Sequence, residues 1–220
     1  MMRGSLLMEV CPGVYALDCT VRSYAYLVVN QPAFLIDTSM PGNHEKILSE
    51  IKSLGVDPQS IGHILLTHHD VDHVGNAAAL KEATGAKLWA SAVDLPYIEA
   101  KEPRPGLKRF VARIIKTTPP MIDATFDNDK IPVPVEVIKT PGHTPGHVVF
   151  LYRDILFAGD MVMTRRGQLR LSPALMTWNL PQARASVRSV AERSFTWICP
   201  AHGHPIHRDQ QWDSIVASTL

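Results

Sequence analysis

The chain has 220 residues, 45% of them apolar, and a formal net charge of +1, so one domain can bury a large core and nothing in the charge favours a nucleic-acid partner. No apolar run approaches the length of a membrane-spanning helix, and residues 1–9 carry no signal-peptide pattern, so we expect no membrane partner. The three cysteines, Cys11, Cys19 and Cys199, follow no disulfide pattern, which favours a reducing, cytoplasmic location.

Apolar and β-branched runs predict a series of strands, several of them apolar enough to be covered on both faces. In chain order the predicted strands are 24–29, 33–37, 63–67, 87–90, 133–139, 148–152, 155–158 and 197–200. Helical periodicity predicts helices over 43–54, 72–84, 107–116 and 181–193, the last beginning with a proline at a first-turn position. The pattern indicates an α/β protein whose helices cover the outer faces of its sheets.

Imidazoles and carboxylates crowd the end of the predicted strand 63–67. Crowding such groups at the end of a buried strand is costly unless a cation compensates them. Zinc, iron and manganese accept nitrogen and oxygen ligands, and a strand that turns into a helix can direct several side chains into one cavity. The segment 67–75 therefore predicts a metal site, with the candidates His68, Asp70, Asp72 and His73.

Three later segments repeat this arrangement. The turn 140–147, rich in Pro and Gly, places His143 and His147 after the strand 133–139. The strand 155–158 leads to Asp160, and the strand 197–200 leads to His202. Because four apolar strands each end in a side chain that can bind metal, we expect a polynuclear site at one rim of the sheets.

Taken in order, these motifs resemble the metallo-β-lactamase superfamily of dinuclear metallohydrolases, and the resemblance covers nearly the whole chain. The matching elements are the aspartate motif 34–38, the segment 67–75, His143, Asp160 and His202. The resemblance implies a four-layer αββα sandwich. It implies a single domain over residues 1–220 with a lid-like insertion around 95–130.

The resemblance also implies two divalent ions, zinc first of all. One ion would be bound by His68, Asp70 and His143. The other would be bound by Asp72, His73 and His202, with Asp160 bridging the two.

Asp70 departs from the common family pattern, in which a histidine occupies this position of the motif His-x-His-x-Asp-His. A carboxylate adds negative charge and a harder oxygen donor, which favours iron or manganese relative to a histidine-rich site. It also resembles the di-iron branch of the superfamily, where the residue is typically glutamate. Zinc, iron and manganese all remain open.

The implied chemistry is hydrolysis by a hydroxide that bridges two metal ions. Asp72 is the candidate catalytic residue, because its carboxylate can accept or orient the proton of the hydroxide. Asp160, where zinc β-lactamases carry a cysteine, resembles the glyoxalase II, lactonase and phosphodiesterase branches. We expect a small ester, lactone or thioester as substrate. A phosphodiesterase, a β-lactam hydrolase and an iron-dependent redox enzyme of the same fold are the alternatives.

The segment 95–130 is irregular and rich in proline, and its part 101–116 carries six basic residues against one acid, Glu102. Because it lies between ligand motifs, we expect it to form a lid over the metal cleft. Its basic face is either a binding surface for an anionic small-molecule substrate or a solvated helix surface. The basic residues are Lys101, Arg104, Lys108, Arg109, Arg113 and Lys116.

Other polar residues are expected to support the ligands rather than to bind metal. His69 should point away from the ions, His147 should orient His143 or its turn, and Asp37 should accept hydrogen bonds beneath the ligands. No role in the site is expected for the surface residues His204 and His207 or for the core residue Cys199.

Overall fold

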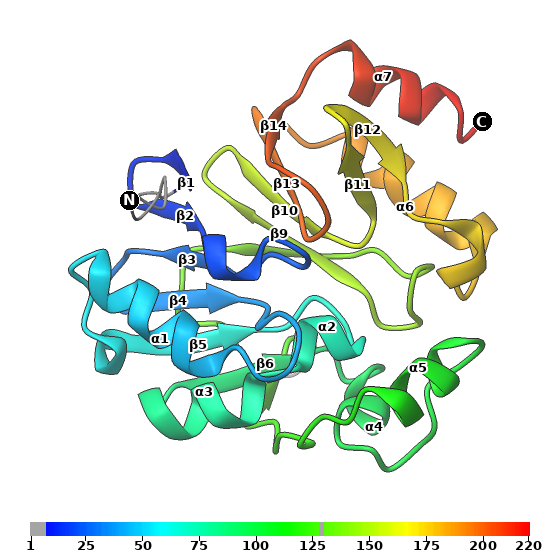
Figure 1. Cartoon of the computed structure of the whole chain (residues 1–220). Helices are drawn as coiled ribbons and strands as arrows, with labels where there is room; N and C mark the ends of the chain where they lie inside the picture. Colours follow the sequence, from blue (N-terminus) through cyan, green and yellow to red (C-terminus); the bar gives the residue numbers. More distant parts are fainter. Residues whose placement is uncertain (1–7, 128–129) are drawn as a thin grey trace.

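The computed structural model describes residues 8–127 and 130–220. Two sheets pack face to face, and helices cover their outer faces (Figure 1). This is the four-layer αββα sandwich that the sequence predicts. The segment 1–7, for which we expect no cleavage signal, lies outside the described residues, as do residues 128–129 of the predicted lid.

The first sheet is formed by the N-terminal half of the chain. Its strand order is β1-β2-β3-β4-β5-β6-β7, antiparallel from β1 to β4 and parallel from β4 to β7. Because β4, β5 and β6 are parallel, their carboxyl ends share one edge of the sheet. The bounds are β1 Met8–Cys11, β2 Val14–Ala16, β3 Tyr26–Val28, β4 Ala33–Ile36, β5 Ile61–Leu65, β6 Lys87–Ala90 and β7 Ala124–Thr125.

The second sheet has the order β14-β13-β10-β9-β8, in which only β10 and β13 pair in parallel. A hairpin of β11 and β12 extends beside it. The bounds are β8 Glu136–Lys139, β9 Val148–Tyr152, β10 Ile155–Gly159, β11 Val162–Arg165, β12 Gln168–Leu171, β13 Trp197–Pro200 and β14 Ile206–His207.

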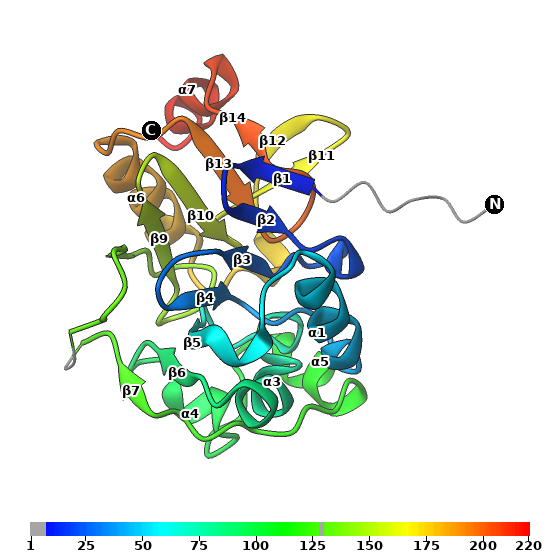
Figure 2. The same cartoon turned by 90° about the vertical axis from the view of Figure 1, so that its left-hand side faces the viewer.

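Helices α1 and α3 pack on the outer face of the first sheet, and α6 and α7 on that of the second (Figures 1 and 2). Within the described chain, no helix is both long and apolar enough to cross a membrane. The bounds are α1 His44–Ser53, α2 Val71–Val74, α3 Ala77–Thr84, α4 Leu95–Ile98, α5 Lys108–Ile114, α6 Leu180–Ala191 and α7 Gln210–Ala217.

Aromatic side chains fill the space between the two sheets. The rings of Tyr26 and Phe157 meet edge to face at 5.2 Å, and those of Phe34 and Tyr152 at 5.7 Å. The hydroxyl of Tyr26 donates to the carbonyl oxygen of Pro200 at 2.7 Å, so its one polar atom is paired. These contacts fix the face-to-face packing that brings strand ends of both sheets to a common rim.

The predicted helix 72–84 is wrong as one element, because the chain breaks between α2 and α3. A Cβ on Gly75 would lie 2.4 Å from the carbonyl oxygen of Ser39, so only glycine allows the chains to approach here. The side-chain amide of Asn76 donates to the carbonyl oxygens of Thr38 and Met40, both at 2.6 Å. The break therefore ties the ligand-bearing turn to the end of β4.

The other differences between the predicted and the observed secondary structure concern the ends of elements and short elements. The predicted strand 133–139 begins only at Glu136, and the predicted helix 107–116 is shorter at both ends. The sequence patterns missed β1, β2, β7, β11, β12 and β14, and also α4 and α7. Most of these elements are two to four residues long, which is too short for a periodic pattern to appear.

We expect the substitution Phe157→Ala to lower the free energy of unfolding by about 3–5 kcal/mol, because it leaves a cavity between the sheets. Phe157 is 1% exposed. Urea denaturation of both proteins measures the difference. The control is Leu175→Ala at a side chain that is 76% exposed, for which we expect a change within about 0.5 kcal/mol. Equal effects of the two substitutions would contradict this assignment of the core.

Candidate metal centre

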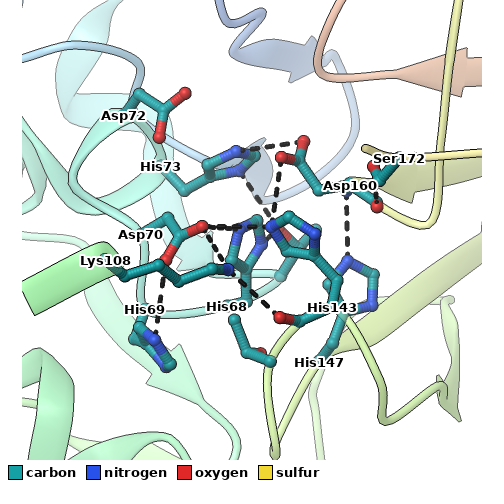
Figure 3. Close-up of polar contacts among 12 residues, drawn as sticks. His68, His69, Asp70, Asp72, His73, Lys108, His143, His147, Asp160 and Ser172 are labelled. Carbon is teal, nitrogen blue, oxygen red and sulfur yellow. Dashed lines mark hydrogen bonds and ion pairs between the residues drawn. The ribbon is translucent and has the colours of Figure 1, made fainter. Parts of the chain in front are cut away.

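The side chains predicted as metal ligands come together at one rim, where strands of both sheets end. Figure 3 shows these side chains with the exception of His202. They form two groups, and within each group one ligand atom per residue lies within 4.8 Å of the others. The first group contains His68, Asp70, His143 and Asp160, and the second contains Asp72, His73 and His202.

The first sheet supplies its part of the site through the turn after β5. The backbone N of Thr67 donates to Oδ1 of Asp37 at 2.8 Å, and its hydroxyl donates to Oδ2 at 2.7 Å. Asp37 follows β4, the neighbour of β5. From this turn the chain enters α2, which carries Asp72 and His73. Asp37 therefore fixes the start of the ligand-bearing turn, from the supporting position that the sequence predicts.

The second sheet supplies its part from three strand ends. His143 lies between β8 and β9, Asp160 directly follows β10, and His202 follows β13. Gly159 has a φ of +49°, and a Cβ there would lie 2.8 Å from Nε2 of His147. Only glycine fits at this position, and it delivers Asp160 into the cluster.

Asp160 contacts both ligand groups. Its Oδ1 lies 3.3 Å from Nε2 of His73, and its Oδ2 lies 3.3 Å from Nε2 of His143 and 3.4 Å from Nε2 of His202. A carboxylate in this position can share its two oxygens between two neighbouring ions. The geometry therefore fits the bridging position that the resemblance implies.

Hydrogen bonds made by Nδ1, on the side of each ring that faces away from the cluster, orient the histidine ligands. The hydroxyl of Thr67 donates its proton to Asp37, so it accepts from Nδ1 of His68 at 3.0 Å. Nδ1 of His73 donates to Asp37 at 2.7 Å, and Nδ1 of His202 donates to a backbone carbonyl oxygen at 2.7 Å. In the neutral imidazoles the lone pair of each Nε2 therefore points into the cluster, as metal binding requires.

Several of the inward atoms are buried and have no hydrogen-bond partner among the described residues. They include Nε2 of His68, Nε2 of His73 and Oδ1 of Asp160. Buried polar atoms without partners are costly, and divalent ions between them would satisfy nitrogen and oxygen together. The donor set of imidazoles and carboxylates fits zinc, iron or manganese.

The carboxylates of the cluster strongly stabilise positive charge. The carboxylate of Asp160, opposed by burial, raises the pKa of His202 to about 11. Burial alone would lower the pKa of His73, but Asp37 and Asp160 raise it well above its usual value. Because metal ligation needs the neutral imidazole, ions that bind here take the place of these protons.

Two further histidines support the ligands. His69 points away from the ion positions, as predicted, and its Nδ1 lies 3.0 Å from Oδ2 of Asp94. Nε2 of His147 accepts the backbone N–H of Asp160 at 3.1 Å, and its Nδ1 contacts the hydroxyl of Thr140 at 2.8 Å. Burial lowers the pKa of His147 to about 3, which keeps this ring neutral. His147 therefore holds the turn, as expected, and also Asp160, which the sequence analysis did not foresee.

The residues expected to have no role in the site lie as predicted. His204 and His207 are exposed, and Cys199 is fully buried in β13. His207 belongs to the short strand β14 rather than to a loop. Nδ1 of His204 contacts the hydroxyl of Tyr24 at 3.0 Å, outside both ligand groups.

Asp94 is a supporting residue that the sequence analysis missed. Its carboxylate is fully buried and accepts from the backbone N of His69 at 3.1 Å, from the backbone N of Gly146 at 2.7 Å and from the hydroxyl of Thr144 at 2.8 Å. It therefore joins the ligand-bearing turns of the two sheets. The sequence feature that could have identified Asp94 is its place after β6, at the edge of the sheet where the ends of β4 and β5 also lie.

Lys108 is the second residue whose role the sequence analysis missed. Although it belongs to the predicted lid, it is buried, and its Nζ lies 2.5 Å from Oδ2 of Asp70 and 3.1 Å from the carbonyl oxygen of His143. Arg104 also reaches the site and donates from Nε to the carbonyl oxygen of His69 at 2.8 Å. Lys101, Arg109, Arg113 and Lys116 are exposed. Of the six basic residues of 101–116, two therefore contact the turns that carry the ligands and four are exposed to solvent.

Comparison with known proteins identifies the family of the chain. Residues 20–202 match the family model of the metallo-beta-lactamase superfamily. The uncharacterized protein YobT of Bacillus subtilis is 29% identical over 210 residues, which cover 87% of this chain and 85% of that protein. The hydroxyacylglutathione hydrolase of Cereibacter sphaeroides is 33% identical over 146 residues, which cover 63% of this chain and 47% of the enzyme, so the match spans about half of its length.

A solved structure is similar along most of the chain. The protein TTHA1623, crystallised in a di-iron-bound form, superposes with a TM-score of 0.66 at 26% identity, and the match covers 85% of this chain and 90% of that one. The fold, the converging histidines and carboxylates and the family match over residues 20–202 lead to one conclusion. The chain belongs to the metallo-beta-lactamase superfamily and is one of its hydrolases.

Proposed function

We propose that the protein hydrolyses a small ester, lactone or thioester with two divalent metal ions. The observation that carries the proposal is the pair of ligand groups with Asp160 between them, 3.3–3.4 Å from histidines of both. The similarity to hydroxyacylglutathione hydrolases supports an acyl substrate, since that name describes a thioester hydrolase.

When bound, a pair of ions supplies water activation and polarisation of the substrate carbonyl. The side chain of Asp72 is 22% exposed and that of His202 is 27% exposed, whereas those of Asp70 and Asp160 are only 9% exposed. Substrate therefore approaches from the side of Asp72. There its carboxylate can accept the proton of the attacking water, with Oδ2 held 3.2 Å from Nε2 of His202.

Apolar side chains near the site support a substrate with an apolar acyl group. Phe110 and Ile114 on α5 are exposed, and so is Trp178, which precedes α6. The backbone N of Trp178 donates to the carbonyl oxygen of His143 at 3.2 Å, and Lys108 of α5 donates to the same oxygen. Both segments therefore lie beside the first ligand group. The exposed cations of the lid support an anionic group elsewhere on the substrate.

We propose zinc as the metal, with iron or manganese as the alternatives that Asp70 favours. The di-iron form of the similar structure supports iron. Iron also makes redox chemistry the second candidate function. The two candidates differ in a measurable way, because hydrolysis needs no dioxygen.

A cytoplasmic location remains part of the proposal. Cys11, Cys19 and Cys199, all within the described chain, are free thiols. Burial raises the pKa of Cys19, and hydrogen bonding to Glu50 raises it further. Thiols that stay protonated and unpaired agree with a reducing compartment.

The wild-type protein, saturated with metal and desalted, should contain about two ions per chain, as the two ligand groups require. The substitution Asp160→Ala should lower the content at both groups, because Asp160 contacts both. Elemental analysis measures the metal content per chain. The control is Glu192→Ala, which removes an exposed acid at the C-terminal end of α6. An unchanged metal content in Asp160→Ala would contradict the bridging assignment.

The substitution Asp72→Asn should lower kcat on any cleaved ester, lactone or thioester by about 10²–10⁴-fold, since a general base typically contributes that much. Product acid is measured directly, with and without dioxygen, and rates are expected to be the same in both. The panel includes a phosphodiester and a β-lactam, because these are the alternative substrates. Oxygen consumption without any acid product would overturn the hydrolase proposal in favour of redox chemistry.

A further inference from the structure

We infer that Lys108 is a tethered cation that competes with metal at the first ligand group, so that the two ions load in sequence and the second ion releases the lid helix α5. The inference rests on the proposed two-ion function and deepens it. In this inference, Lys108 controls when the second ion binds and completes the two-ion centre.

The first observation is the placement of the ammonium group. The side chain of Lys108 is 5% exposed, and its Nζ lies 2.5 Å from Oδ2 of Asp70. Within the described parts of the chain, its other hydrogen-bond partner is the backbone carbonyl oxygen of His143 at 3.1 Å, so both contacts belong to residues of the first group (Figure 3). Lysine is almost never buried unless it is paired, and here the pair is formed inside the metal centre.

The second observation is that Lys108 occupies the oxygen that faces the other ligands. Oδ2 of Asp70 lies 3.3 Å from Nε2 of His68 and 3.0 Å from Nε2 of His143. The other oxygen, Oδ1, faces away, 3.5 Å from Nε2 of His69. An ion held by the first group must contact Oδ2, and two cations on one buried oxygen repel each other strongly. Metal therefore has to displace the ammonium group to bind there.

The second ligand group carries no such competitor. Among the described residues, Asp72, the carboxylate of this group, forms an ion pair only with His202. An imidazole can bind metal through a ring nitrogen, whereas the ammonium group of Lys108 offers no lone pair to a metal ion. The second group should therefore take up the first ion, and the first group the second ion.

The third observation links metal loading to the lid. Of the seven residues of α5, Lys108 alone is buried. Phe110 is 45% exposed and Ile114 is 83% exposed, so apolar packing contributes little to holding this helix in place. Lys108 is therefore the one buried side chain by which α5 is held to the site, and its displacement should loosen the helix.

The first test is a calorimetric titration of the metal-free protein with Zn²⁺. Wild type should bind two ions with affinities that differ by at least about tenfold, and Lys108→Met should strengthen the weaker site by about tenfold or more. The matched control is Arg109→Met, which removes the neighbouring exposed cation and should behave like wild type. Thermal unfolding of each variant checks that it is folded.

The second test needs no variant and no activity. Hydrogen exchange of the backbone in 108–114 is followed as Zn²⁺ is added to wild type. The first equivalent should leave the exchange of α5 unchanged, and the second should accelerate it. Iron, added anaerobically, should have the same effect in the same order.

The outcomes separate the inference from the proposed function. The inference would be overturned if both ions bound with equal affinity in wild type and in Lys108→Met. It would also be overturned if the second equivalent left the hydrogen exchange of α5 unchanged. Either result would leave the two-ion function standing. A single ion in both proteins would contradict the two-ion function itself. If only Lys108→Met binds metal more tightly, and α5 loosens at the second equivalent of metal, the results would support both the inference and the proposed two-ion function.

Discussion

Buried carboxylate charge is the constraint on which the rest of the structure depends. Asp37, Asp70, Asp94 and Asp160 are all nearly inaccessible to solvent, and each lies where the ligand-bearing turns meet. In each case nearby donors compensate the charge: backbone N–H groups, hydroxyls, imidazoles or the ammonium of Lys108. Burial alone would raise the pKa of Asp70, yet Lys108 and the neighbouring histidines hold it well below its usual value. The turns adopt their shape because they must supply these donors.

The sequence predicts the parts of the site that lie at strand ends. Strands such as 87–90 and 148–152 have the observed bounds, because runs of buried apolar residues have a clear pattern. The residues His68, Asp160 and His202 follow such runs directly, so their convergence can be inferred from the fold. Local pattern and tertiary structure agree in these segments.

The sequence analysis failed where a residue acts through a distant partner. The break at Gly75 depends on the approach of Ser39, and the role of Asp94 depends on a turn about fifty residues further along the chain. Lys108 belongs to a run of basic residues whose pattern is typical of a solvated helix. Its burial follows from the negative charge of Asp70, to which nothing in the local sequence of 101–116 points.

Each ligand group draws residues from both sheets, and this sets the mechanical role of the metal. In the second group Asp72 and His73 follow the first sheet, and His202 follows the second. Bound ions would therefore cross-link the two halves of the sandwich at their common rim. Folding and metal binding should then be coupled, with the ions adding to the aromatic packing between the sheets.

The hydrogen bond from the backbone of Asp160 to His147 has a consequence for tolerance to acid. Because burial lowers the pKa of His147 from 6.5 to about 3, the folded ring stays neutral and keeps accepting this bond in mildly acidic solution. The unfolded chain binds a proton at this ring below about pH 6.5, so the contribution of His147 to stability falls as the pH drops from there toward 3. Acid therefore weakens the fold before it disrupts the hydrogen bond that holds the backbone of Asp160 in place.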